Sequence, residues 1–248
     1  MSTRYHLGCS GFSYADWKGL VYPPELPQRQ WLQHYATLFD SVEINNSFYR
    51  MPTTELVRGW YDKTPAAFKF VLKGSRYVTH LKKLLEPREH VARFHAMADE
   101  LEEKLACVLW QLPRNMPVDL ERLRAFCAVL EPRHRNVIEF RHNSWWEEPE
   151  VRAILHEHRV AFCGISAPSG LSEELVETTD FAYIRFHGAS AWYRYDYSRR
   201  ELQHWARRIR KLKAKEVFIY FNNDFEANAV HNGLHLRDLL ERQPRRKT

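Results

Sequence analysis

Two hydrophobic patterns follow one another repeatedly along this chain. Short apolar runs rich in β-branched and aromatic residues are typical of buried strands, and the stretches between them carry apolar residues at helical spacing. The predicted strands are Tyr5–Cys9, Val42–Asn45, Phe68–Lys73, Ala106–Gln111, Val137–Arg141, Val160–Ile165, Phe181–His187 and Val217–Asn222. The predicted helices are Gln28–Phe39, Thr54–Lys63, Arg88–Lys104, Leu120–Leu130, Glu148–His156, Arg199–Lys213 and Ala227–Glu241.

Strands that alternate with helices predict a parallel sheet covered by helices, and eight such strands favour closure into a (β/α)8 TIM-type barrel. The sixth unit is expected to be irregular, because 167–180 holds only a short amphipathic piece at 172–177. A doubly wound open sheet is the alternative fold. Such a sheet usually has a glycine-rich phosphate turn after its first strand, whereas G-C-S-G-F-S-Y contains only Gly8 and Gly11.

The chain shows no internal repeat or linker, so residues 1–248 are predicted to form one barrel domain with a short basic tail, R-Q-P-R-R-K-T. A hydrophobic fraction of 44% argues against intrinsic disorder. The four cysteines are scattered, and neither a signal peptide nor a membrane span is visible. We therefore expect a soluble cytoplasmic protein that does not enter a membrane.

Polar residues gather at the carboxyl ends of the predicted strands. Side chains two residues apart share a face of a strand, which pairs Glu43 with Asn45, Glu139 with Arg141, and Arg185 with His187. Further polar strand ends are Lys73, Gln111, Asn222, Asn223 and Asp224. In a barrel these ends converge at one mouth, where such enzymes place their active sites.

Charges that enter a barrel need partners, because an unpaired buried charge costs several kcal/mol. The expected ion pairs are Glu139 with Arg141 or Arg185, and Glu43 with Lys73. A purely structural interpretation, in which these pairs only close the top of the core, remains open.

Seven motifs in order along the chain resemble the YecE-like family, a domain family of unknown function. They are G-C-S-G-F-S-Y-x-x-W-K-G with Y-P-P, V-E-I-N-N-S-F-Y-R-M-P, F-K-F-V-L-K-G-S-R-Y-V-T-H, L-W-Q-L-P, I-E-F-R-H-N-S-W, Y-I-R-F-H-G and Y-F-N-N-D. The resemblance spans nearly the whole chain and implies a TIM-type barrel, but it implies no reaction. Cys9 departs from the family pattern, where a small hydroxyl residue such as Thr is expected.

Acid–base hydrolysis is one chemistry that the strand ends suggest. Glu43, Glu139 and Asp224 supply carboxylates from three strands, and His187 could assist them. The alternative is that each carboxylate neutralises a neighbouring Arg or Lys, which would lower its pKa and spoil it as an acid.

Binding of an anion is the second chemistry, because the mouth carries more cations than a neutral sugar requires. Lys73, Arg141 and Arg185 are predicted to hold the anion. The other predicted ligand-binding residues are Asn45, Tyr49, Arg76, His80, Trp145, Asn222 and Asn223. The aromatic members would stack on a sugar or a base.

Two further chemistries have weaker support. Glu43, Glu139, His187 and Asp224 are hard metal ligands, but Lys73, Arg141 and Arg185 would repel a cation, so no metal and no cofactor is predicted. Cys9 could act as a nucleophile beside His187, although a buried Cys more often serves as a small apolar residue.

The function predicted from these residues is binding, and potentially hydrolysis, of a phosphate-bearing sugar, nucleotide or nucleic-acid end. The alternative is a non-catalytic nucleic-acid-binding or adaptor protein that uses a basic helix at 199–215. Between Arg199 and Glu216 there are eight Lys or Arg against two acidic residues, a local excess equal to the +6 of the whole chain. A hydrated helix face explains the same charges.

Overall fold

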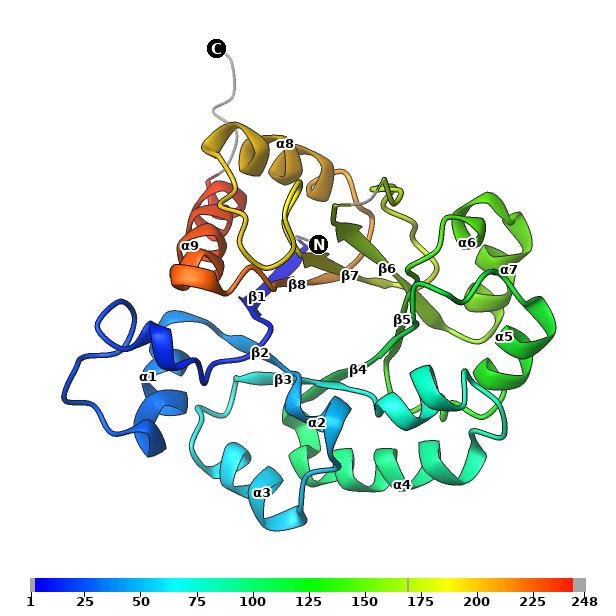
Figure 1. Ribbon diagram of the computed structural model, residues 1–248, viewed down its shortest axis with the longest axis horizontal. Coiled ribbons are helices and arrows are strands. Elements are labelled where there is room, and N and C mark those ends of the chain that lie inside the picture. Colours follow the sequence, from blue (N-terminus) through cyan, green and yellow to red (C-terminus); the bar gives the residue numbers. More distant parts are fainter. Residues whose placement is uncertain (1–2, 169, 243–248) are drawn as a thin grey trace.

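Eight parallel strands form a nearly closed barrel in the computed structural model, which describes residues 3–168 and 170–242. The strands are β1 Arg4–Cys9, β2 Ser41–Ile44, β3 Lys69–Lys73, β4 Leu105–Gln111, β5 Asn136–Glu139, β6 Val160–Ser166, β7 Phe181–Phe186 and β8 Glu216–Phe221. Their hydrogen-bonded order is β1-β8-β7-β6-β5-β4-β3-β2. Figure 1 shows the strands as a ring with helices outside it. The predicted TIM-type barrel is confirmed, and the open doubly wound sheet is wrong.

Each predicted helix is present, with ends that differ by a few residues. The α-helices are α1 Trp31–Leu38, α2 Asn46–Tyr49, α3 Thr54–Asp62, α4 Arg88–Ala98, α5 Leu120–Cys127, α6 Ser144–Glu147, α7 Pro149–Glu157, α8 Arg199–Ile209 and α9 Asn228–Glu241. Short segments of 3₁₀-helix are η1 Ala15–Trp17, η2 Gln28–Gln30, η4 Asp99–Lys104 and η5 Phe225–Ala227, and η3 Tyr77–Leu81 is a π-helix. Most of the predicted basic tail, 243–248, lies outside the described residues.

Local sequence explains where several helices begin. The Thr53 side chain accepts a hydrogen bond from Leu56 N at the start of α3, and Asp119 does the same for Arg122 N at the start of α5. In α8, Ser198 and Glu201 form a reciprocal capping box. These caps satisfy backbone N–H groups that a helix start leaves without partners.

The sixth unit is irregular, as predicted. The described residues between β6 and β7 form no helix, and the segment 171–178 runs in extended or irregular backbone. Thr178 attaches this segment to the barrel, because its Oγ1 accepts from Phe162 N at 3.1 Å and donates to Val160 O at 2.7 Å. In this unit the Thr178 side chain therefore holds an irregular segment against β6, at the position where a helix covers the barrel in the other units.

Side chains close the seam between β1 and β2, where the strands are not paired by a ladder. The Tyr35 hydroxyl accepts a hydrogen bond from Cys9 N at 2.7 Å and donates one to Ser41 O at 3.0 Å. A Cβ on Gly8 would lie 2.1 Å from Ser41 O, so this close approach requires glycine. Asp40 Oδ1 accepts from Leu7 N at 3.1 Å lower in the seam. The barrel thus closes through a buried tyrosine.

Among the described residues, no helix has the length and apolar character that crossing a membrane requires.

Candidate functional site

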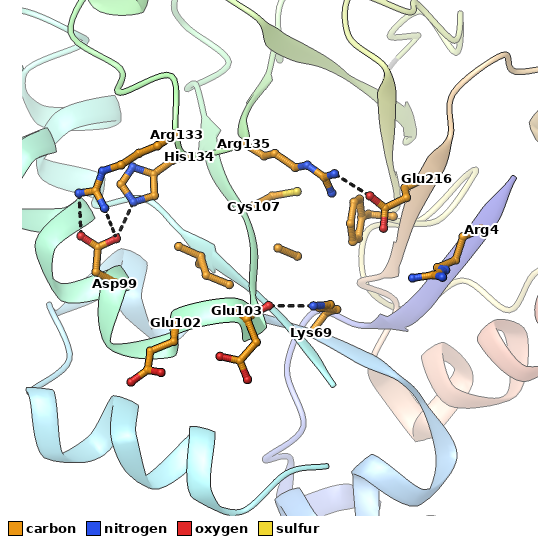
Figure 2. Close-up of a pocket in the computed structure, with 13 residues that line it drawn as sticks. Arg4, Lys69, Asp99, Glu102, Glu103, Cys107, Arg133, His134, Arg135 and Glu216 are labelled. Atoms are coloured by element: carbon orange, nitrogen blue, oxygen red, sulfur yellow. Dashed lines mark hydrogen bonds and ion pairs between the residues drawn. The ribbon is translucent and has the colours of Figure 1, made fainter. Parts of the chain in front are cut away.

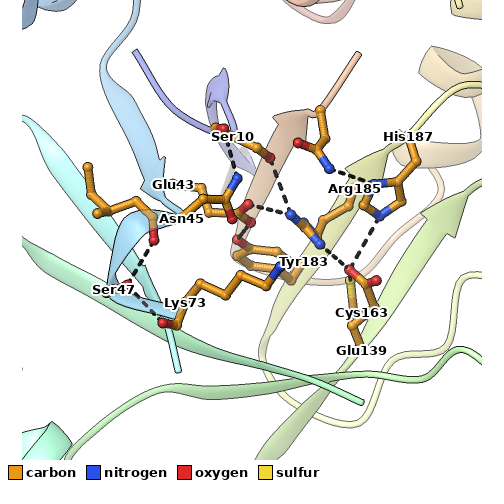
Figure 3. Close-up of polar contacts among 12 residues, drawn as sticks. Ser10, Glu43, Asn45, Ser47, Lys73, Glu139, Cys163, Tyr183, Arg185 and His187 are labelled. Atoms are coloured by element: carbon orange, nitrogen blue, oxygen red, sulfur yellow. Dashed lines mark hydrogen bonds and ion pairs between the residues drawn. The ribbon is translucent and has the colours of Figure 1, made fainter. Parts of the chain in front are cut away.

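Two carboxylates and two guanidinium groups form a buried network at the carboxyl ends of the strands, here called the central ion cluster. Figure 3 shows Glu43, Glu139 and Arg185 of this cluster. Arg185 on β7 donates from Nη1 to Glu139 and from Nη2 to Glu43, each at 2.6 Å. Arg141 donates from Nε to the other oxygen of Glu139. Tyr183 donates to the second oxygen of Glu43 at 2.6 Å. All four oxygens of the two carboxylates are therefore engaged.

The cluster keeps its charges because they compensate one another. Burial alone would raise the pKa of Glu139, but the charges of Arg141 and Arg185 outweigh it and hold that pKa well below its usual range. Burial likewise opposes the charge of Arg185, but Glu139 and Glu43 hold its pKa well above the usual value. The two negative and two positive groups give the cluster a net charge of zero.

The predicted pairing of Glu139 with Arg141 or Arg185 is confirmed, and the structure contains both pairs. The predicted pair of Glu43 and Lys73 is wrong: Glu43 pairs with Arg185, and neither carboxylate lies within ion-pair distance of Lys73 among the described contacts. The reason is that the long Arg185 side chain extends across the barrel and occupies the position opposite Glu43.

His187 lies at the upper edge of the cluster and is fully buried. Arg141 Nη2 lies 2.9 Å from His187 Nε2, and Glu139 Oε2 lies 3.4 Å from the same nitrogen. The other ring nitrogen, Nδ1, lies 3.0 Å from Nδ2 of the Asn222 amide. Burial, with the Arg141 charge, lowers the pKa of His187 well below its usual value. The imidazole is neutral near pH 7 and orients Arg141.

Lys73, at the end of β3, is the cation that the cluster leaves without a counter-ion. Its Nζ has no hydrogen-bond or ion-pair partner in the described part of the chain and lies 4.3 Å from the centre of the Phe48 ring. Burial and the nearby Arg185 charge lower the pKa of Lys73 to about 7. Near neutral pH this amine is therefore present in both its charged and its neutral form.

A cavity of about 460 Å³ opens beside Lys73 at the carboxyl ends of the strands and is here called the mouth cavity. Its lining comes from the loops after β1, β2, β7 and β8 and from the end of β3. The lining residues are Ser10, Gly11, Phe12, Ser13, Tyr14, Ile44, Asn45, Asn46, Tyr49, Lys73, Tyr193, Asn222 and Asp224. Burial raises the pKa of the Asp224 carboxyl, so this group exchanges protons closer to neutrality than an exposed Asp does.

The loop between β7 and α8 covers one side of the mouth. The Trp192 ring lies 4.7 Å from the Arg141 guanidinium and 5.4 Å from the His187 ring, which shields both from solvent. Gly188 turns the chain back at φ +107, and a Cβ there would lie 2.1 Å from Ala191 O. The tight turn after His187 therefore depends on glycine.

The predicted site residues divide into three groups. Glu43, Glu139, Arg141, Arg185 and His187 meet in the central ion cluster, whereas the mouth cavity is lined by Asn45, Tyr49, Lys73, Asn222 and Asp224. Arg76, His80, Trp145 and Asn223 belong to neither lining. His80 contacts the Phe48 ring edge-to-face, with ring centres 5.0 Å apart, and Arg76 is exposed. Asn223 donates to Tyr195 O and to Asn232, which fixes loop backbone.

The ligand-stacking role predicted for Trp145 is wrong, whereas Cys9 takes the buried packing position that was its favoured interpretation. The Trp145 indole is buried in the core, where it stacks on Phe140 at 4.5 Å and donates to Met116 O, so it presents no face to a ligand. Cys9 is fully buried, and burial raises the pKa of its thiol, which keeps the sulfur protonated and unreactive. Its position supports packing rather than nucleophilic chemistry.

Sequence reasoning missed several contributors to this region. Tyr183 shares the strand face of Arg185 and His187, so the same alternation could have identified it. Ser10 and Tyr14 belong to the quoted motif G-C-S-G-F-S-Y, and both line the mouth cavity. Tyr193 lies in a loop of no regular pattern, and only the fold brings it to the cavity.

A larger cavity, about 650 Å³, lies at the opposite, amino ends of the strands (Figure 2). Several of its charged groups are engaged: Arg133 pairs with Asp99 at 2.8 Å, Arg135 pairs with Glu216 at 2.6 Å, and Lys69 Nζ donates to the backbone carbonyl of Glu103 at 2.8 Å. Arg4 and Glu102 also line the cavity and have no ion pair among the described contacts. This end of a barrel generally serves stability. We therefore place the candidate site at the mouth despite its smaller volume.

No group of three or more His, Cys, Asp or Glu side chains is arranged to hold a metal ion within 3–168 and 170–242. The hard ligands Glu43 and Glu139 are occupied by guanidinium groups instead.

Comparison with known proteins places the chain among barrels without an assigned activity. A family model with the description "Protein of unknown function DUF72" matches residues 6–248. The UPF0759 protein YunF of Bacillus subtilis (strain 168) is 25% identical over 95% of this chain and 94% of YunF. The UPF0759 protein YecE of Escherichia coli (strain K12) is 28% identical over 52% of this chain and 49% of YecE.

Solved structures agree with this placement. The crystal structure of a DUF72 family protein from Thermotoga maritima MSB8 superposes with a TM-score of 0.88 at 31% identity, covering 96% of this chain and all of that chain. A DUF72 family protein from Enterococcus faecalis V583 superposes with a TM-score of 0.81 at 22% identity and shares the fold. These matches agree with the resemblance seen in the motifs.

Proposed function

We propose that this chain, which belongs to the DUF72 family of proteins of unknown function, binds a small anionic ligand in the mouth cavity through Lys73. The observation that carries the proposal is the charge balance at the mouth. The Glu43 and Glu139 carboxylates are neutralised by Arg141 and Arg185, which leaves Lys73 without an ion-pair partner among the described residues, beside a cavity that the Asp224 carboxyl also lines. An anion that entered the cavity would supply the missing counter-ion.

The remaining lining suits a ligand that also carries hydroxyl groups and a flat face. Asn45 Nδ2 donates to Ser10 O at 2.8 Å, while Asn45 Oδ1 has no donor among the described residues. A buried acceptor without a partner costs free energy, which a ligand hydroxyl or a water would relieve. Tyr14, Tyr49 and Tyr193 add aromatic surface. A phosphate-bearing sugar or a nucleotide has all of these features.

Hydrolysis of the ligand stays a prediction. Asp224 is the predicted catalytic residue that lines the cavity, and its raised pKa suits an acid that exchanges a proton with a ligand. Glu43, Glu139 and His187 would then act indirectly, by holding Arg185 and Arg141 in place.

A thermal-shift experiment tests the proposed binding. Orthophosphate, ribose 5-phosphate and adenosine monophosphate are compared with ribose and adenosine at the same concentrations. A ligand at 100 times its Kd stabilises the native state by about 2.7 kcal/mol, which raises the Tm by several degrees. We expect this shift for a phosphorylated compound with the unaltered protein and with Lys82→Gln, and its loss in Lys73→Gln. Equal shifts in both variants would exclude Lys73 as the binding group.

The basic segment 199–215 is the second candidate site, for nucleic acid or an acidic partner. Arg199, Arg200, Arg207 and Lys211 are exposed and free to contact a polyanion. Other members are already engaged: Arg208 with Glu173, Arg210 with the carbonyls of Leu239 and Arg242, and Lys215 with Asp180. If this face binds a polyanion, reversal of Arg207 and Lys211 to Glu weakens binding and flattens its salt dependence. Unchanged affinity would remove this candidate.

A further inference from the structure

We infer that Lys73 is a covalent nucleophile that forms an imine with the carbonyl group of a small anionic aldehyde or ketone in the mouth cavity. This inference rests on the proposed function, because the anionic group would draw the ligand to the same cavity. It adds a reaction and a substrate class, namely an open-chain sugar phosphate or a comparable carbonyl acid.

A comparison of two lysines in this chain shows why Lys73 differs from a structural lysine. Lys104 is almost fully buried, and its ammonium donates to Tyr61 O at 2.6 Å, to Thr64 O at 2.8 Å and to Thr64 Oγ1 at 3.3 Å. These acceptors engage the N–H bonds of the ammonium, although burial lowers the pKa of this lysine too. Lys73 has no such acceptor in the described structure and lines a cavity. Its lone pair is therefore accessible to a ligand once a proton leaves.

The surroundings of Lys73 favour loss of that proton. The Arg185 and Arg141 guanidinium groups repel its positive charge, and burial penalises the charge further. A pKa of about 7 gives roughly a thousand times more free amine at pH 7 than an ordinary lysine has. Desolvation and neighbouring cations are the two means by which proteins activate lysine as a nucleophile. Both act here on one side chain.

The reaction can be written in balanced steps. The Lys73 Nζ lone pair attacks the carbonyl carbon, and the carbonyl π electrons move to oxygen. A proton passes from nitrogen to that oxygen, giving a carbinolamine. A protonated carboxyl group then donates its proton to the hydroxyl, the C–O bond breaks, and water leaves as nitrogen forms the C=N bond. The products are a protonated imine, a carboxylate and one water.

Asp224 is the lining residue that fits the acid in this sequence. It shares the mouth cavity with Lys73, and burial raises its pKa, which increases the fraction of protonated carboxyl. The protonated imine that results carries its positive charge at the position of the former ammonium. The Glu43 and Glu139 carboxylates act on this position as they act on Lys73, favouring the charged form.

Reductive trapping tests the inference directly. The full-length protein is incubated at pH 7 with sodium cyanoborohydride and one of three probes, followed by intact-mass measurement and peptide mapping. Dihydroxyacetone phosphate has both the anion and the carbonyl, dihydroxyacetone lacks the anion, and glycerol 3-phosphate lacks the carbonyl. We expect one adduct per chain from dihydroxyacetone phosphate, located on Lys73 and formed more than tenfold faster than any adduct on Lys82. Glycerol 3-phosphate should slow this reaction without forming an adduct.

The outcomes separate this inference from the proposed function. Binding of both phosphorylated probes with no adduct on Lys73 would overturn the inference and leave anion binding standing. An adduct on Lys73 formed equally by dihydroxyacetone would support the nucleophile and contradict the anionic ligand. Adducts spread over surface lysines, with no binding, would overturn both. Lys73→Arg provides the matched variant, because it should retain anion binding and lose the adduct. The mapping on unaltered protein decides the question even if this variant fails to fold.

Discussion

The Arg185 Nη1 atom lies 2.6 Å from Oε2 of Glu139 at the centre of the barrel, and neither side chain is exposed to solvent. Arg185 also holds Glu43 at 2.6 Å, so it compensates two buried carboxylates at once. Loss of this guanidinium leaves charges that the protein interior cannot solvate.

Replacement of Arg185 should therefore be strongly destabilising. We expect Arg185→Met to lower the free energy of unfolding by about 3–5 kcal/mol, as found when one partner of a buried ion pair is removed. Urea denaturation followed by circular dichroism measures the change. Arg208→Met is the matched control, because Arg208 pairs near the surface with Glu173 at 3.6 Å, and it should cost less than about 1 kcal/mol. Similar losses in the two variants would contradict the structural role of the cluster.

His187 should make stability depend on pH in the mildly acidic range. Its pKa is well below the unfolded value of about 6.5, so between the two pKa values the unfolded chain binds the extra proton. Stability is then complete above about pH 6.5 and falls as pH drops, by at most about 1.4 kcal/mol per pH unit from this group. The unfolding free energies of unaltered protein and His187→Gln, measured between pH 5 and 8, should converge toward low pH. Parallel curves would refute the neutral, buried imidazole.

Lys73 should lower stability while it serves the site. Its folded pKa of about 7 lies below the unfolded value near 10.4, so its charge penalises the folded state fully below pH 7, and the penalty fades as pH rises toward 10.4. We expect Lys73→Met to be more stable by about 1–3 kcal/mol at pH 7, with a smaller gain at pH 9.5. Chemical denaturation at both pH values measures this difference. A variant less stable than the unaltered protein at pH 7 would show that the ammonium has a partner.

The seam between β1 and β2 should depend on the Tyr35 hydroxyl. Tyr35→Phe leaves the buried Cys9 N–H and Ser41 C=O without this partner, which should cost about 2–3 kcal/mol. Tyr61→Phe is the control, because its hydroxyl donates to Glu103 at the surface and should change stability by less than about 0.5 kcal/mol. Hydrogen exchange at the β1 amides should accelerate in the first variant alone. Unchanged exchange there would mean that the seam is closed by other contacts.

The sequence predicted much of this site because side chains alternate between the two faces of a strand, so residues two positions apart share a face. It placed Glu139, Arg141 and Arg185 on the inner face, where the structure joins them. This alternation does not show how far a side chain extends across a barrel, and for this reason the predicted partner of Glu43 was wrong. The surplus charge on Lys73 is visible only once every pair has been identified.

The aromatic residues were harder to assign than the charged ones. Trp145 and Tyr49 both follow strand ends in sequence, yet Trp145 is buried in the core and Tyr49 is 71% exposed at the cavity. An aromatic ring suits either environment, and sequence spacing in loops does not distinguish them. The fold itself was more predictable, because each of its units repeats a strong periodic pattern and the irregular sixth unit lacks one.

The most direct test of anion binding at Lys73 is a calorimetric titration with proton counting. The phosphorylated compound that gives the largest thermal shift is titrated at pH 7.5 in two buffers that differ in ionisation enthalpy. An anion beside Lys73 raises its pKa from about 7, so binding should take up a substantial fraction of one proton per chain. In Lys73→Met, affinity should fall at least tenfold and the uptake that comes from Lys73 should vanish. Equal affinity and equal proton uptake in the two proteins would contradict the assignment of Lys73 as the anion-binding cation.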